Sequence, residues 1–142
     1  MRTTPQAEAV AEALRHFGHA TNHRLLSAVL VTFPNLTATT VHRITTRLIA
    51  EGLASRGPEL GGAVLIDANP APHDHFICQA CGGVRDIHVS SETLDDLQRQ
   101  LGRNLVGGGI TITGTCAPCR PDAAARPWHR TRLTRPSRSC CA

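Results

Sequence analysis

Two Cys-x-x-Cys pairs constrain the fold of this chain more than any other feature of its sequence. The first pair is Cys78 and Cys81, the second is Cys116 and Cys119, and 34 residues separate them. Four thiolates offered by two such turns match the tetrahedral coordination of a structural zinc ion. Two disulfides or an iron–sulfur cluster are the alternatives for the same residues. A region of about fifty residues has too small a core to fold unaided, which favours a zinc ion that all four cysteines enclose.

Helical periodicity predicts three helices in the N-terminal half of the chain. Thr4 and Pro5 suit the start of the first helix, and Gly18 suits its end. The three helices are expected at residues 5–17, 21–33 and 37–51. Two short strands are then expected within residues 53–66, around a turn at residues 56–62. Three helices followed by a hairpin predict a winged-helix DNA-binding domain over residues 1–67.

The third predicted helix has one apolar face and one face rich in hydrogen-bond donors. Val41, Ile44 and Leu48 fall on the apolar face. The residues expected to contact DNA from this helix are Thr39, Thr40, His42, Arg43, Thr46 and Arg47. An ordinary solvated surface helix is the alternative, and the glycine-rich hairpin that follows favours DNA reading instead.

The second half of the chain predicts a small α+β domain. Residues 68–72 are rich in Asn, Pro and Ala and are expected to form a linker, followed by a metal-binding domain at residues 73–120. Its strands and single helix are expected at residues 75–78, 84–89, 91–104 and 110–115. The whole chain therefore belongs to the mixed α and β class. Residues 121–142 are rich in Arg, Pro, Ser and Ala and are expected to be disordered.

Charge is divided unevenly along the chain. The net charge of +4 combines −1 over residues 1–119 with +5 over residues 120–142. A specific DNA contact must therefore come from a local patch, while the Arg-rich tail adds non-specific attraction to nucleic acid. Cys140 and Cys141 lie in this tail as thiols without an assigned role. We expect a cytoplasmic protein, because the sequence contains neither a membrane-spanning apolar run nor a signal peptide.

A second set of metal-binding side chains precedes the first cysteine pair. His73 and His75 are two residues apart, so on a strand they point to the same side. Neutral imidazoles at this spacing bind divalent ions, although polar residues on an exposed strand show the same pattern. Asp67 and Asp86 are available as oxygen ligands if the fold brings them near.

Two strings of residues resemble the ferric uptake regulator (Fur) superfamily. TATTVHRITTRLIAEGLASR is similar to its recognition-helix region, and HDHFICQACGGVRDI is similar to its histidine-rich sensor segment and first cysteine pair. Gly114 before Cys116 and Cys119 fits the second pair, so the resemblance covers residues 4–120. It implies a homodimer whose C-terminal domains pair, with each winged helix in one major-groove half-site of a palindromic operator.

The resemblance also implies a regulatory metal site, most like that of the peroxide-sensing branch. The matching ligands in this chain are His19, Asp67, His73, His75 and Asp86. The last of these is aspartate in peroxide sensors and commonly glutamate in iron sensors, so Asp86 favours peroxide sensing. One ion bound by all five residues joins the two domains and makes the protein competent to bind DNA. In peroxide sensors of this family, ferrous iron and hydrogen peroxide oxidise a ligand histidine, for which His19 and His73 are the matching candidates.

These features predict a metal-dependent transcriptional repressor rather than an enzyme. The expected cofactors are a structural Zn²⁺ and a regulatory Fe²⁺ or Mn²⁺, with Zn²⁺ as the alternative regulatory ion. An iron or zinc uptake regulator is the nearest alternative function. A zinc-dependent hydrolase at His73 and His75 is disfavoured, because no general base is supplied beside them and the donor-rich helix is left unexplained. A zinc-ribbon adaptor that binds protein is a further alternative. A gel-shift assay with palindromic DNA separates the two functions, because only the repressor is expected to bind that DNA.

The chain departs from the family pattern in two places. His42 stands where many members carry a tyrosine, so the resemblance does not imply the half-site sequence. Pro72 stands where a further histidine is frequent, and no histidine directly precedes Cys116. The second departure favours a single regulatory metal site.

Overall fold

The computed structural model describes residues 3–105 and 107–120. The chain divides into two units, residues 1–71 and 72–142, and the division falls within the stretch expected to be a linker. The tail expected at residues 121–142 lies outside the described residues. Among the residues that the structure describes, none forms a helix long and apolar enough to cross a membrane.

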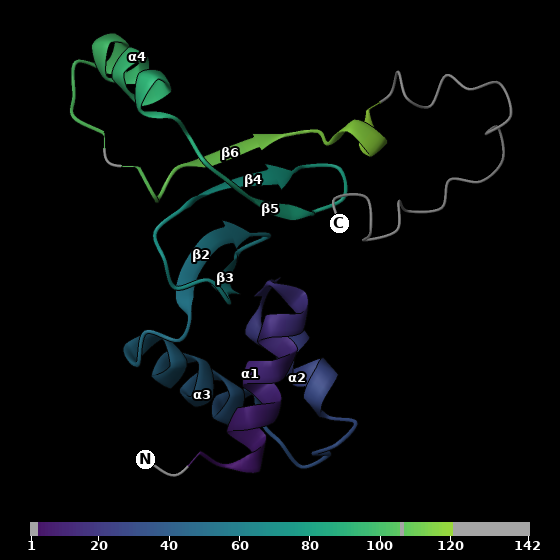
Figure 1. Ribbon diagram of the computed structural model, residues 1–142. Coiled ribbons are helices and arrows are strands. Elements are labelled where there is room, and N and C mark those ends of the chain that lie inside the picture. Colours follow the sequence, from purple (N-terminus) through teal and green to yellow (C-terminus); the bar gives the residue numbers. More distant parts are fainter. Residues whose placement is uncertain (1–2, 106, 121–142) are drawn as a thin grey trace, which may run out of the picture. The chain divides into compact units, whose positions relative to one another are not determined.

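Three helices begin the first unit (Figure 1). Each of them has a threonine cap. They are α1 (Pro5–Phe17), α2 (Asn22–Val29) and α3 (Ala38–Ala50). The hydroxyl oxygens of Thr4, Thr21 and Thr37 each accept a hydrogen bond from the backbone N–H three residues later. Each cap satisfies a donor that the first turn of the helix leaves open.

The second helix is shorter than its apolar pattern predicts. The pattern continues to Phe33, but α2 ends at Val29. The Val29 carbonyl accepts hydrogen bonds from the N–H groups of both Thr32 and Phe33, at 3.1 and 2.9 Å. The backbone therefore tightens into a turn, and Val31 is left 89% exposed.

The three helices pack their apolar faces around the core of the first unit. Val10, Leu25 and Val41, one from each helix, are fully buried. Burial of a side chain of this size contributes roughly 1.5–3 kcal/mol. Leu14, Val29 and other apolar side chains extend the same cluster. The first unit thus has a hydrophobic core of its own.

A three-stranded antiparallel sheet completes the first unit. β1 (His19–Ala20) and β2 (Ser55–Leu60) pair with β3 (Ala63–Asp67), in the order β1-β3-β2. The sequence does not predict β1, because two residues carry no periodicity. The hairpin turn is also shorter than predicted. It consists of Gly61 and Gly62, since an irregularity between Arg56 and Glu59 lets β2 continue through the expected turn.

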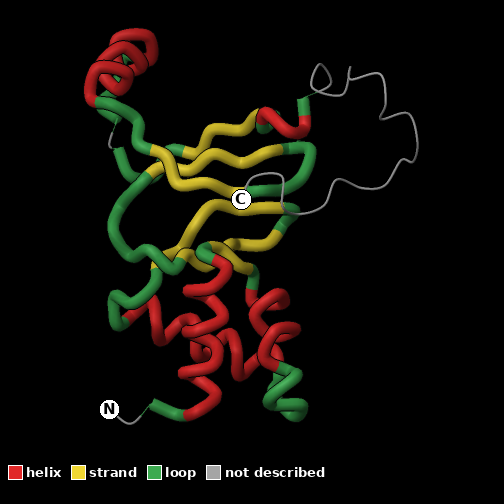
Figure 2. Tube along the Cα trace, turned by 45° about the vertical axis from the view of Figure 1, so that its right-hand side comes forward, coloured by secondary structure: helices red, strands yellow, loops and turns green. Residues whose placement is uncertain are grey.

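The second unit contains a sheet of order β5-β4-β6 (Figure 2). β4 (Asp74–Cys78) is antiparallel to β5 (Val84–Ile87) and parallel to β6 (Thr111–Gly114). The parallel pair needs a crossover, which α4 (Ser91–Leu101) supplies, and a short 3₁₀ helix, η1 (Ala117–Cys119), follows β6. The mixed helix and strand class predicted from sequence is confirmed.

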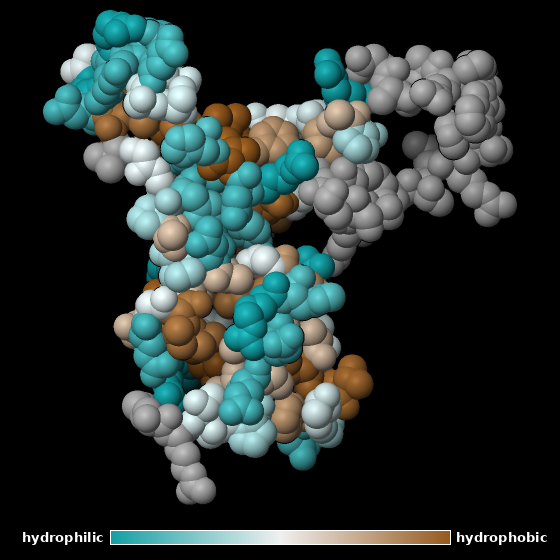
Figure 3. Space-filling model, viewed as in Figure 1, coloured by the Kyte–Doolittle hydropathy of each residue, from teal (hydrophilic) through white to brown (hydrophobic). Residues whose placement is uncertain are grey.

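The fourth helix is shorter than predicted, and none of its residues is buried. The helix was expected to reach residue 104, but Gly102 adopts a left-handed conformation at φ 62° and donates its N–H to the Gln98 carbonyl. The visible surface of α4 is mostly hydrophilic (Figure 3). Its apolar residues Leu94 and Leu97 are half-buried, and Leu101 is 59% exposed.

Candidate metal sites and nucleic-acid interface

Four cysteine sulfur atoms gather at one end of the sheet in the second unit. Cys78 ends β4 and Cys81 lies in the turn to β5, while Cys116 follows β6 and Cys119 ends η1. The parallel register of β4 and β6 places Cys78 beside Gly114, so the second cysteine pair follows at the same end. The four sulfur atoms lie within 4.8 Å of one another.

This cluster has the dimensions of a tetrahedral thiolate site. Zinc–sulfur bonds of about 2.3 Å place neighbouring sulfur atoms about 3.8 Å apart. The sulfur atoms of Cys81 and Cys116 are separated by 3.9 Å. A disulfide between these two residues requires about 2.05 Å, so the observed separation argues against one.

The local backbone favours the thiolate form of Cys78. The N–H of Cys116 donates to Cys78 Sγ at 3.3 Å, and this bond is the main reason that the pKa of Cys78 falls from 9.0 to about 6, although burial acts to raise it. The N–H of Gly83 also donates to Cys81 Sγ, at 3.4 Å. Because the thiolate is the form that binds metal, the donors and their spacing fit one zinc ion.

Three of the predicted regulatory ligands come together in the second unit. The register of β4 and β5 places His75 opposite Asp86, and His73 directly precedes β4. His73 Nε2 lies 3.3 Å from Asp86 Oδ1, and the ring centroids of His73 and His75 are 4.4 Å apart. His75 is buried, whereas the Asp86 side chain is 45% exposed. The register of β4 and β5, together with the residue that precedes β4, thus brings two imidazoles and one carboxylate to one place.

The other two predicted regulatory ligands meet in the sheet of the first unit. His19 of β1 and Asp67 of β3 are direct register partners, with His19 Nε2 3.3 Å from Asp67 Oδ2. Asp67 is 1% exposed, and its Oδ1 accepts a 2.7 Å hydrogen bond from the backbone N–H of Asn69. This bond holds the carboxylate in place at the end of β3.

The predicted regulatory ligands of both units offer imidazole nitrogen and carboxylate oxygen atoms, and none of them is a thiolate. His19 and Asp67 belong to the first unit, and the remaining three residues belong to the second. Such donors accept Fe²⁺, Mn²⁺ and Zn²⁺. The residues present therefore fit the predicted regulatory ion, but their chemistry does not select among these metals.

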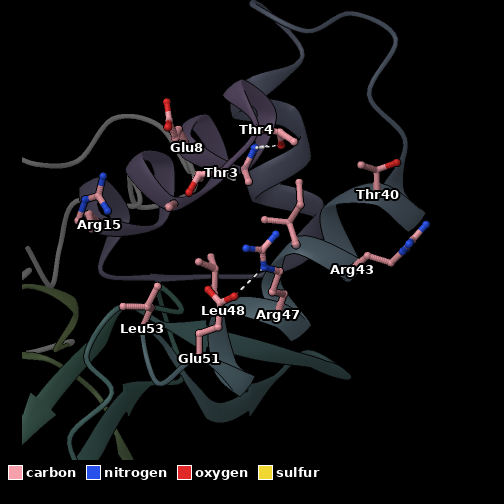
Figure 4. Close-up of a pocket in the computed structure, with 13 residues that line it drawn as sticks. Thr3, Thr4, Glu8, Arg15, Thr40, Arg43, Arg47, Leu48, Glu51 and Leu53 are labelled. Atoms are coloured by element: carbon pink, nitrogen blue, oxygen red, sulfur yellow. Dashed lines mark hydrogen bonds and ion pairs between the residues drawn. The ribbon is translucent and has the colours of Figure 1, made fainter. Parts of the chain in front are cut away.

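The residues predicted to contact DNA lie on the solvent side of α3. Those that are exposed are Thr39, Thr40, His42, Arg43 and Thr46. Arg47 is half-buried instead, and its Nε donates to Glu51 Oε1 at 2.7 Å (Figure 4). Arg43 extends away from this pair, at the margin of a groove of about 460 Å³ that Arg15 also lines. Arg43 is therefore the better placed of the two helix arginines to meet a phosphate or a base.

Asp74 has a structural role that sequence analysis missed. It is 2% exposed, and its Oδ1 accepts the N–H groups of Gly108, Gly109 and Ile110 at 2.9, 3.2 and 3.0 Å. Its Oδ2 accepts the N–H of Val89 at 3.1 Å. Burial acts to raise the pKa of Asp74, but these backbone donors together lower it below 3.8. The carboxylate ties the loop before β6 to the start of β4, next to His73 and His75.

Comparisons with known proteins agree with this arrangement of elements. The sequence pattern of the Ferric uptake regulator family matches residues 1–106. A peroxide-responsive repressor, PerR, of Staphylococcus epidermidis is 26% identical over 128 residues, which cover 86% of this chain and 83% of that protein. The peroxide operon regulator of Bacillus subtilis is 28% identical over 125 residues, which cover 84% of each chain.

A solved structure supports the fold. A zinc uptake regulator complexed with zinc and DNA superposes with a TM-score of 0.62 at 23% identity, covering 87% of this chain and 87% of that one. Members of the matching family are transcription regulators, so the hydrolase alternative is set aside. Because the family pattern spans most of the sequence, this chain belongs to the Ferric uptake regulator family.

Proposed function

We propose that this protein is a metal-dependent transcriptional repressor that responds to peroxide. The observation that carries the proposal is the donor chemistry: each unit presents an imidazole beside a carboxylate, at 3.3 Å in both cases, in addition to the separate thiolate cluster. In this proposal the four cysteines hold a structural Zn²⁺. His19, Asp67, His73, His75 and Asp86 hold one regulatory Fe²⁺ or Mn²⁺.

The regulatory ion would act by joining the two units. Its ligands are divided between them, so only a conformation that brings both sets to one point satisfies the whole coordination shell. If that conformation is also the one that fits DNA, metal binding and DNA binding stabilise each other. Stronger metal binding to that conformation by about 2.7 kcal/mol shifts the population about a hundredfold.

Peroxide would release the protein by altering a ligand. Bound ferrous iron supplies the chemistry that activates hydrogen peroxide. One oxygen atom of the peroxide ends on the imidazole ring of His19 or His73, and the other leaves as water. A ring modified in this way is a poorer metal ligand, so the two units separate and DNA is released. The two similar peroxide regulators and the aspartate at position 86 favour this branch over an iron or zinc uptake regulator.

The expected partners are a second copy of the chain and palindromic DNA. Leu101 and Ile112 of the second unit are 59% and 45% exposed, and pairing with another copy would cover apolar surface of this kind. A two-fold dimer presents two α3 helices to the two half-sites of a palindrome. Because a repressor acts on chromosomal DNA, we place the protein in the cytoplasm.

The first experiment maps where oxygen is added. Purified full-length protein is loaded anaerobically with Fe²⁺ and exposed to a small excess of hydrogen peroxide, and its peptides are analysed by mass spectrometry. We expect one added oxygen atom on His19 or His73 and loss of DNA binding. The exposed His23 and His88 serve as internal controls and should stay unmodified. If no histidine is modified while the iron-loaded protein still binds DNA, the protein senses iron or another metal instead.

A further inference from the structure

A side chain of α2 orients the histidine of the predicted DNA-reading helix. Asn22, the first residue of α2, has its Nδ2 3.1 Å from Nδ1 of His42 in α3. Thr45 follows on the inner side of α3 and is 1% exposed. Its Oγ1 lies 2.9 Å from Asn22 Oδ1 and 3.1 Å from the His42 carbonyl oxygen. Three side chains from two helices therefore form a continuous hydrogen-bonded chain that ends on the imidazole.

The direction of these hydrogen bonds follows from the donors that are available. Asn22 Oδ1 faces the Thr45 hydroxyl, which also has the His42 carbonyl oxygen within reach, and Asn22 Nδ2 faces His42. An amide nitrogen can only donate, so Nδ1 of His42 is the acceptor. A ring nitrogen that accepts a hydrogen bond carries no proton, and the neutral ring then has its proton on Nε2. The chain of bonds thus fixes both the plane of the His42 ring and its tautomer.

We propose that Asn22 is a positioning residue that makes His42 a sequence-specific donor to guanine in the major groove. The proposal rests on the proposed DNA-binding function. His42 is exposed in the first half of α3, the part of a recognition helix that reaches base edges. Guanine offers two acceptors in the major groove, adenine offers one beside an amino donor, thymine offers one beside a methyl group, and cytosine offers an amino donor.

A fixed tautomer matters for a base contact and adds little to a phosphate contact. A ring free to exchange its proton presents Nε2 either as a donor or as an acceptor, so it discriminates poorly between bases. A phosphate oxygen needs only some donor within reach. The buried Thr45 hydroxyl and the Asn22 amide are therefore best explained by reading of a base.

The positioning step is tested on the free protein. In nitrogen-15-labelled full-length protein at about pH 8, where imidazoles are largely neutral, correlation spectra of the ring nitrogens should show His42 as the Nε2–H tautomer. Asn22→Ala should convert His42 to a mixture of tautomers. The control is His23→Ala, which removes the exposed neighbouring side chain of α2 and should leave the His42 signals unchanged. An unchanged His42 tautomer in Asn22→Ala would overturn the proposal.

The specificity step is tested by selection from a pool of randomised DNA duplexes with metal-loaded protein. Wild type and His23→Ala should prefer guanine at one position of each half-site. Asn22→Ala and His42→Ala should each lose about tenfold discrimination there, and the double variant should lose no more than either alone. Equal weakening on all sequences would assign His42 to phosphate and overturn the proposal. If wild type selects no sequence although the tautomer changes as expected, the proposed DNA-binding function is wrong and only the positioning by Asn22 stands.

Discussion

At the scale of single residues, Asp74 shows how one carboxylate can organise a loop. Its two oxygens accept four backbone N–H groups, from the loop before β6 and from the segment after β5. Of the four donor residues, Val89 is buried, while Gly108 and Ile110 are half-buried and Gly109 is exposed. A negative charge that is 2% exposed is tolerated here because every hydrogen bond stabilises the charged form.

The Asp74→Asn variant should therefore lose about 2 kcal/mol of unfolding free energy in zinc-loaded protein. The asparagine amide keeps one acceptor oxygen, but its NH2 group replaces the other oxygen and points its own hydrogens at a backbone N–H. At least one of the Asp74 hydrogen bonds is therefore replaced by repulsion between two donors. Urea unfolding followed by fluorescence of an attached dye measures the loss. Asp95→Asn on the exposed face of α4 removes the same charge and should change stability little. Equal effects of the two substitutions would show that the Asp74 hydrogen bonds contribute nothing specific.

A glycine in the same loop is required by its backbone angle and by its neighbour. Gly108 has φ +89°, and a Cβ added there would lie 2.7 Å from the Cβ of Pro72. Gly108→Ala should destabilise the protein by about 1–3 kcal/mol, measured by the same urea titration. The control is Gly109→Ala, since a Cβ at Gly109 meets nothing within 4 Å. A Gly108→Ala protein as stable as the Gly109→Ala protein would contradict this account of the loop.

At the scale of elements, a zinc ion held by the four cysteines would fasten β6, the last strand of the second unit, to β4, its first strand. β4 and β6 are parallel neighbours; β4 ends at Cys78, and Cys116 follows β6. The helix between them has no buried residue, so apolar packing holds this unit weakly. A structural zinc ion is worth roughly 10–16 kcal/mol in small zinc-binding peptides, far more than the packing that this sheet can supply.

Cys116→Ser should therefore abolish zinc binding and unfold the second unit, while the helices of the first unit remain folded around their own core. Zinc released into a colorimetric chelator gives the stoichiometry, and circular dichroism and amide spectra report which unit is lost. Ala117→Ser introduces the same hydroxyl at the next, exposed position and should retain both zinc and fold. A zinc-free Cys116→Ser protein with an intact second unit would rule out the structural role of the metal.

The elements that sequence predicts well are those whose signals are local. Thr4 and Thr21 mark the starts of α1 and α2 as N-caps. The two cysteine turns are predicted by the Cys-x-x-Cys spacing alone. By contrast, β1 has only two residues, and its partner Asp67 is distant along the chain, so only resemblance indicated that His19 and Asp67 meet. The hydrogen bond between Asn22 and His42 likewise joins two different helices, so no periodic pattern in the sequence predicts it.

At the scale of the whole molecule, the two units have separate means of folding. The first has a hydrophobic core, and the second has a thiolate cluster that fits zinc. We therefore expect each unit to fold without the predicted regulatory ion. The regulatory ligands are divided between the units, so loss of that ion should alter the coupling of the units without unfolding either one.

This division makes His19 the most informative residue for the coupling. In wild type, Mn²⁺ should raise DNA affinity about a hundredfold, equivalent to about 2.7 kcal/mol, and should protect the linker at residues 68–72 from proteolysis. His19→Ala should lose most of both effects and keep its zinc and helices, because Asp67 alone then remains to hold the ion from the first unit. His16→Ala, on the exposed surface of α1, is the matched control and should respond as wild type does. Titration of fluorescent operator DNA with and without Mn²⁺ gives the affinities. If His19→Ala still gains the full hundredfold, His19 does not couple the units, and the switch must be transmitted through Asp67 or by a change inside the second unit.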